Sequence, residues 1–110
     1  MLLEGECDLT VMAELSVVPL GTGSTELSSY IVEALKRIKR VKGLKWQLTA
    51  MGTIIETDSL AKLFDVVADA HEALFDLGAL RVSTLIKIDD RRDTRGERMK
   101  GKVDSVMAKI

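Results

Sequence analysis

A segment near the start of the chain alternates apolar and polar residues and then breaks into a glycine-containing turn. Val11 to Val18 reads VMAELSVV, so every second residue from Val11 onward is apolar and shares one face of a strand. The PLGTGS that follows interrupts this strand, because proline cannot donate to a β ladder and glycine permits positive φ. The pattern predicts a strand with one buried face, followed directly by a turn.

The turn leads into an amphipathic helix. Ser24 or Thr25 can cap its start, and Gly43 ends it. Between them the apolar residues recur at spacings of three and four, as on one face of a helix: Leu27, Tyr30, Ile31, Ala34, Leu35, Ile38 and Val41. We therefore expect this face to pack against the strand that precedes it.

A hairpin is predicted next. Lys45 to Met51 alternates and is typical of an edge strand, whereas residues 53–57 are rich in β-branched side chains. Only Gly52 separates the two segments, so they should pair through a tight turn.

A second helix and a fourth strand follow the hairpin. Asp58 or Ser59 can cap the helix, and Gly78 closes it. Its expected apolar face consists of Leu60, Leu63, Phe64, Val67, His71, Leu74 and Phe75. Residues 81–89 alternate as a strand, and the highly charged residues 90–102 are expected to form a loop. A short closing amphipathic helix would carry Val103, Val106, Met107 and Ile110.

This order of elements predicts an α+β fold of the ferredoxin-like βαββαβ type. Two right-handed crossovers would put both long helices on one face of a four-stranded antiparallel sheet. The other face is then bare. A face this apolar is unfavourable in water, so we expect it to pack against another subunit, with its polar members lining a pocket there. The residues expected on it are Glu14, Ser16, Val18, Leu85 and Lys87.

Composition limits the possible environments of the protein. The chain has 110 residues, 46% hydrophobic and 30% charged, which is typical of one globular domain. No apolar run approaches the roughly 20 residues of a bilayer crossing, and the first residues lack the charge pattern of a signal peptide, so we expect a cytoplasmic protein. The single cysteine, Cys7, excludes an intrachain disulfide and a cysteine metal cluster.

The chain carries few of the residues that catalysis requires. His71 is the only histidine, and on an apolar helix face it is expected to be a core or interface residue. The sequence has no phosphate-loop motif. We therefore expect no enzyme, no metal and no cofactor, although a mechanism that pairs Glu14 with Glu56 stays open.

Nucleic acid is not the expected partner either. The net charge is −1, and although residues 87–102 and the first helix are rich in cations, the predicted strands 11–18 and 53–57 carry no aromatic side chain. RNA-recognition modules with this order of elements stack bases on aromatic residues of the central strands.

Several motifs together resemble a known family. The chain resembles the small cytoplasmic thiamine-binding protein family related to YkoF, from about Met12 to Val106, in the motifs SVVPLGTGS, SSYIVEAL, LTAMGTIIE, DAHEALFDLGALRVSTLIKIDDRRD and GKVDSV. The resemblance implies a ferredoxin-like fold, a homotetramer built from dimers, and binding of thiamine or its hydroxymethylpyrimidine part without chemical change. Residues 1–11 are then an N-terminal extension, and residues 12–110 form a single ligand-binding domain.

The chemistry of thiamine suggests which residues line such a site. Thiamine joins a cationic ring to an aminopyrimidine, so a site should offer carboxylates to the cation, and donors and acceptors to the pyrimidine. The candidates are the acids Glu14, Glu56 and Asp89 and the hydroxyls Ser16, Thr22 and Thr53.

Each candidate also has a structural interpretation. Glu14 in an apolar strand needs a partner, which Lys87 can supply. Glu56 and Asp89 lie at strand ends, where solvated acids are common. Gly21 to Ser24 could bind an anion at a helix start or simply form a capped turn. Besides the disfavoured enzyme, two functions therefore stay open: a thiamine carrier or sensor with its pocket between subunits, and a structural or regulatory oligomer without a small-molecule ligand.

Overall fold

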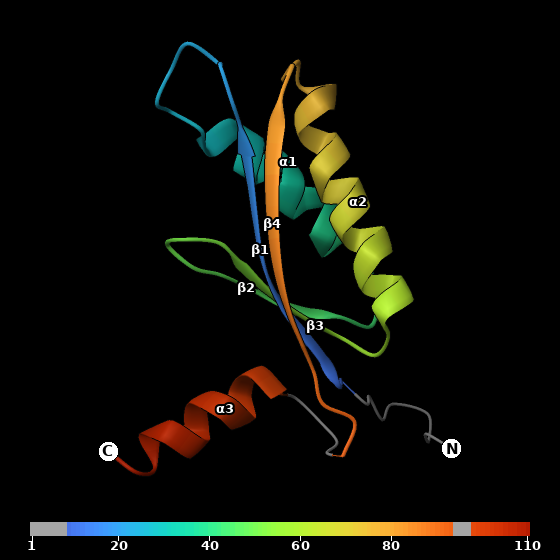
Figure 1. The fold of residues 1–110 in the computed structure, drawn as a ribbon, viewed down its shortest axis with the longest axis vertical. Helices are drawn as coiled ribbons and strands as arrows, with labels where there is room; N and C mark the ends of the chain where they lie inside the picture. The colour runs from blue at the N-terminus through green and yellow to red at the C-terminus, as the bar shows by residue number, and fades with distance from the viewer. Residues whose placement is uncertain (1–8, 94–97) are drawn as a thin grey trace.

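The computed structural model describes residues 9–93 and 98–110, and within this part the elements follow the predicted order (Figure 1). The strands are β1 (Val11–Pro19), β2 (Lys45–Leu48), β3 (Thr53–Thr57) and β4 (Val82–Asp90). The helices are α1 (Ser28–Lys39), α2 (Leu60–Asp76) and α3 (Arg98–Met107). The strands form one antiparallel sheet in the order β2-β3-β1-β4. The ferredoxin-like α+β fold expected from the sequence is confirmed.

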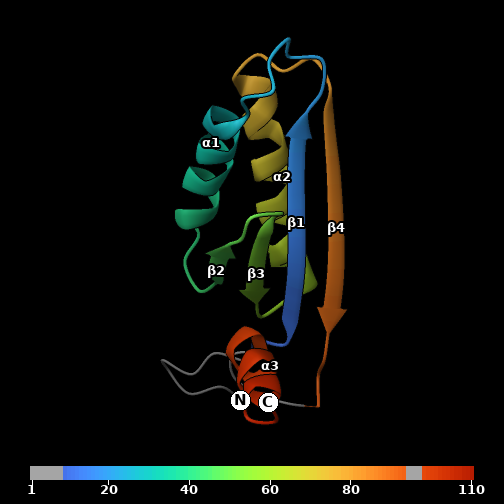
Figure 2. The same cartoon turned by 90° about the vertical axis from the view of Figure 1, so that its left-hand side faces the viewer.

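The alternation of β1 decides what lies on each face of the sheet. Every second residue from Val11 is buried under α1 and α2, beside Ile55 of β3 and Ile86 of β4, and Figure 2 shows both helices on the same side. The opposite face is called the open face here. It carries Met12, Glu14, Ser16 and Val18 of β1, Lys45 and Gln47 of β2, Ile54 and Glu56 of β3, and Ser83, Leu85, Lys87 and Asp89 of β4.

The two long helices begin differently. The Ser59 side chain accepts a hydrogen bond from the Lys62 N–H at 3.2 Å, which confirms one of the two predicted caps of α2. The predicted caps of α1 are wrong, because α1 begins only at Ser28 and no side chain caps it at Leu27. The Ser24 hydroxyl instead accepts from the Glu26 N–H, within the loop before the helix.

The apolar face of α2 differs from the prediction. Its buried residues are Leu63, Val66, Ala70, Ala73 and Leu74. Phe64, by contrast, is 52% exposed, and Phe75 also lies at the surface. Alanines allow α2 to approach the sheet closely, so the buried stripe is rotated away from the two phenylalanines.

Two segments have different lengths from those predicted. β2 ends at Leu48, three residues before Met51, because the Thr49 hydroxyl and the Gly52 carbonyl already form the turn. The predicted loop over residues 90–102 is wrong at its end, since α3 already begins at Arg98. α3 starts against the open face and then projects from the end of the molecule, with the C-terminus at its far end (Figure 1).

The predicted N-terminal extension, residues 1–11, lies mostly outside the described residues, as does Cys7. Of the three described residues, Leu9 is buried, the Thr10 carbonyl accepts from the Arg91 N–H, and Val11 opens β1. None of the described helices is long and apolar enough to cross a membrane.

Candidate ligand-binding site

A cleft lies where the sheet is only partly built. β1 pairs with β4 along its whole length but with β3 only from Val11 to Leu15, because β2 and β3 are short. Beyond Leu15, a cavity of about 210 Å³ lies between α1, the turn of the β2–β3 hairpin and the upper half of β1. This hairpin cleft is lined by residues 15–18 of β1, Ile31, Ala34, Leu35 and Ile38 of α1, and residues 48–53 of the hairpin.

The hairpin cleft has mainly apolar walls with a few hydroxyl groups. Ser16 and Thr53, two of the predicted site residues, both line it. Thr49 lines it too, but its hydroxyl holds the turn: it donates to the Gly52 carbonyl at 2.8 Å and accepts from the Gly52 N–H at 3.1 Å. The wall formed by the turn is therefore fixed by its own hydrogen bonds.

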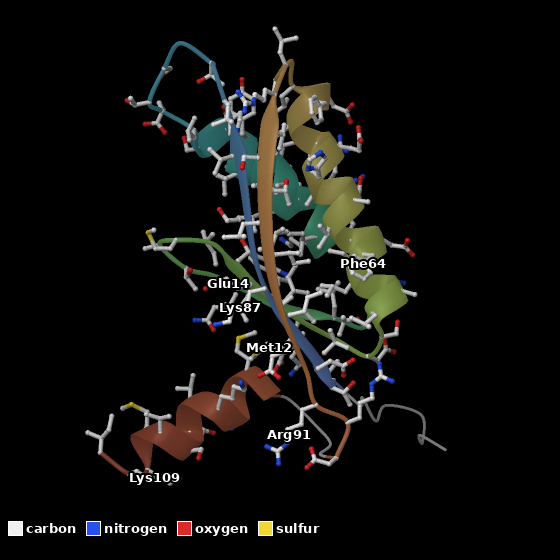
Figure 3. The ribbon with its side chains drawn as sticks, in the orientation of Figure 1. Met12, Glu14, Phe64, Lys87, Arg91 and Lys109 are labelled. Carbon is white, nitrogen blue, oxygen red and sulfur yellow. The ribbon has the colours of Figure 1, made fainter. Side chains whose placement is uncertain are left out.

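Glu14 lies on the open face, close to the hairpin turn that forms one wall of the cleft. A β-carbon built on Gly52, a cleft residue, would lie 3.6 Å from Glu14 Cγ. The Glu14 side chain is exposed and stands directly opposite Lys87 of β4, as Figure 3 shows for the two labelled residues. Lys87 is therefore placed as the sequence suggested, beside Glu14 on the open face.

A second cavity, of about 250 Å³, covers the lower part of the open face. Met12, Glu14, Ile54, Lys87 and Asp89 line it, together with Lys102 of α3. Asp89 forms a salt bridge with Lys102, so this predicted site residue ties α3 to the sheet. The cavity holds two acids and two lysines, which makes its charge balanced.

Glu56 is not the solvated strand-end acid that the sequence allowed. Its side chain is only 1% exposed, because the first turn of α3 covers it and the Met99 N–H donates to its carboxylate. Burial of a carboxylate requires such hydrogen bonds. Glu56 therefore anchors α3, and it also borders a third cavity between α3 and β2.

Thr22 lies apart from the other candidates. Its hydroxyl donates to the Ser24 carbonyl at 2.9 Å, inside a loop whose glycines Gly21 and Gly23 have positive φ. The carboxylate of Glu26 accepts from the Ser28 N–H at 3.1 Å, and the Ser28 hydrogen bonds lower the pKa of Glu26. A carboxylate already occupies the start of α1, which makes this loop a poor anion site.

The six predicted residues therefore do not form one site. Ser16 and Thr53 line the hairpin cleft, Glu14 lies on the open face in the second cavity, Glu56 and Asp89 lie where α3 meets the open face, and Thr22 lies in the loop before α1. The turn residues of the hairpin were missed, because their alternation predicted a longer strand instead.

Other polar clusters have structural partners. His71 Nδ1 lies 2.6 Å from the Thr84 hydroxyl, and its ring packs against Phe75. Arg91 pairs with Asp93, and Arg92 with Asp90, as expected for a mutually paired charged loop. Within residues 9–93 and 98–110, no group of histidine, cysteine and acidic side chains could hold a metal ion.

Comparisons of sequence relate the chain to a family. Residues 13–107 match the model of the family described as "Thiamine-binding protein". A UPF0045 protein of Methanothermobacter thermautotrophicus is 46% identical over 101 residues, covering 91% of this chain and 99% of the relative. The Bacillus subtilis protein YqgV is 38% identical, covering 86% of this chain and 92% of the relative.

Comparisons with solved structures agree with these sequence comparisons. The crystal structure of a hypothetical protein from Methanocaldococcus jannaschii has a TM-score of 0.77 at 31% identity, and covers 87% of this chain and 94% of that one. A Thermotoga maritima structure, named as a candidate thiamine biosynthesis or salvage protein, has a TM-score of 0.72 at 23% identity, covering 87% and 97%, and supports the fold. The family match and these relatives establish that the chain belongs to the thiamine-binding protein family.

Proposed function

We propose that this protein binds thiamine or its hydroxymethylpyrimidine part without chemically changing it. The observation that carries the proposal is an apolar cleft whose hairpin wall, at Gly52, lies next to the acidic residue Glu14 of the open face. The pyrimidine ring lies in the hairpin cleft, and the cationic ring lies outside it, next to Glu14. Membership of the thiamine-binding family supports the same ligand class.

The size and charge of the site fit a ligand of two unlike parts. The hairpin cleft, at about 210 Å³, is smaller than the roughly 300–1,000 Å³ pockets that enclose drug-sized ligands, so it suits one ring. Glu14 then provides the negative charge that a thiazolium cation requires. A non-catalytic carrier or sensor needs no more than this.

We further propose that a second copy of the chain completes the site. Leu85 on the open face is 72% exposed, and the apolar stripe of α3 is exposed as well. A second copy that covers these side chains would also cover Glu14 and shield its charge from water. The homotetramer built from dimers that the family resemblance implies is consistent with this arrangement.

Isothermal titration of the purified chain with thiamine and with free hydroxymethylpyrimidine tests the proposal. Both should bind saturably. Glu14→Gln should weaken thiamine binding roughly tenfold, which corresponds to about 1.4 kcal/mol, and should change binding of the neutral pyrimidine much less. Glu72→Gln, which alters an exposed acid on α2, is the matched control and should change neither.

The competing function is a structural or regulatory oligomer without a small-molecule ligand. It predicts an assembled protein that gives no binding heat with either compound. If Glu14→Gln weakened the binding of thiamine and of the pyrimidine equally, the proposed binding function would stand. Glu14 would then have a structural role instead of a contact with the cation.

A further inference from the structure

The upper half of β1 presents a backbone edge that no strand covers. β3 begins opposite Leu15, so the residues from Ser16 to Pro19 pair with β4 alone. Pro19, which has no N–H to donate, lies at the end of this edge, where proline is tolerated. The hairpin cleft lies directly beside the same edge.

Three contacts show which peptide groups of β1 face the cleft. The Thr10 carbonyl and the Leu20 N–H both bond toward β4. The Leu15 carbonyl oxygen, in contrast, would lie 2.8 Å from a β-carbon on Gly52, so it faces the hairpin. Peptide groups of successive strand residues point to opposite sides. The N–H and C=O of Val17 therefore point into the hairpin cleft.

Val17 is an unusual place for unpaired backbone groups. The residue is only 6% exposed, yet residues 9–93 and 98–110 provide no backbone partner for Val17 on the hairpin side. More than nine in ten buried backbone N–H groups in proteins have a partner, because a buried donor without one has lost its water and gained nothing. A polar edge in the cleft at this position would give both groups a partner.

We propose that the backbone N–H and C=O of Val17 recognise the edge of a 4-aminopyrimidine ring. Such a ring carries an acceptor, the ring nitrogen, beside a donor, the amino group, and the two groups of Val17 complement this pair. Ile31, Leu35 and Leu48 provide apolar walls for the ring faces. This inference rests on the proposed function, since it concerns the same cleft, and adds the group that selects the ligand.

Selectivity follows from the backbone pairing. A 4-oxopyrimidine has nearly the same shape, but it presents an acceptor and a ring N–H donor in reversed positions. Its edge would leave both Val17 groups unpaired, and sites built around buried hydrogen bonds strongly reject such analogues. The cleft should therefore distinguish the amino from the oxo ring, whatever group is attached outside.

Amide NMR of the full ¹⁵N-labelled chain tests this inference. Titration with 4-amino-5-hydroxymethyl-2-methylpyrimidine should move the Val17 amide proton downfield and slow its exchange with solvent. The Ile86 amide is the matched control, because it faces the free edge of β4, away from the cleft, and should not move. The 4-oxo analogue should bind at least tenfold more weakly.

The possible results separate this inference from the function on which it rests. Saturable binding with an unmoved Val17 amide, or equal affinity for the amino and oxo rings, would overturn the backbone recognition and leave ligand binding standing. If neither thiamine nor the pyrimidine bound at all, both proposals would be wrong.

Discussion

At the scale of single residues, Gly52 controls how closely the hairpin approaches β1. A β-carbon at this position would lie 2.8 Å from the Leu15 carbonyl oxygen, which is backbone and cannot rotate away. Gly52→Ala should therefore push the hairpin from β1 and lower the unfolding free energy by about 1–3 kcal/mol, as overpacking does. Urea denaturation followed by circular dichroism measures this loss.

Gly101→Ala is the matched control for that substitution. Gly101 lies inside α3, and nothing stands within 4 Å of a β-carbon there. Alanine should instead favour the helix by about 0.5–1 kcal/mol. Two identical substitutions should thus act in opposite directions, and a similar loss for both would contradict the close approach at Gly52.

The sequence predicted residue faces better than residue burial. Alternation alone puts Glu14 and Lys87 on the same face, because side chains in a strand repeat every two residues. Burial of Glu56 could not be predicted, since it depends on α3, more than 40 residues later in the chain. Phe64 was misplaced because hydrophobicity alone favours a phenylalanine over the alanines that actually pack inward.

At the scale of elements, the two long helices make a testable contrast. The Ser59 hydroxyl caps α2 by accepting from the Lys62 N–H. Ser59→Ala should lower the unfolding free energy by about 0.5–2 kcal/mol, because this N–H of the first turn loses its acceptor. Ser24→Ala is the matched control. It changes a serine that the sequence also marked as a cap but that lies in an exposed loop before α1, and it should alter stability by less than about 0.5 kcal/mol. Thermal or urea unfolding of both variants measures the difference, and equal effects would contradict the assignment of the caps.

The sequence predicted which segments form strands, but it did not predict where the first hairpin strand ends. The alternation of residues 45–51 continues through the turn, although only residues 45–48 have partners in β3. Alternation records which face a side chain prefers and says nothing about where the hydrogen-bonded ladder stops. The hairpin cleft exists because the ladder stops early, so the cleft could not be derived from the pattern that predicted its strands.

At the scale of the whole molecule, apolar surface remains exposed on one side. Val103, Val106 and Met107 of α3, followed by Ile110 at 90% exposure, form a stripe at spacings of three and four. α3 begins against the open face, where Lys102 pairs with Asp89, and Leu85 of the same face is exposed as well. The sequence predicted both parts, the bare face and the amphipathic tail, but not that α3 starts against that face.

We propose that a second copy of the chain covers this surface. A substitution that prevents this association is a direct test. Val106→Asp puts a charge in the centre of the stripe, where burial of an unpaired carboxylate is costly. The variant should shift the chain from oligomer to monomer in sedimentation velocity while its circular dichroism stays unchanged. Val32→Asp is the control, because Val32 is also half exposed but lies on α1, on the other side of the sheet, and should leave the assembly intact. If the second copy completes the site, Val106→Asp should also weaken thiamine binding, and full affinity in a monomeric variant would show that one chain suffices.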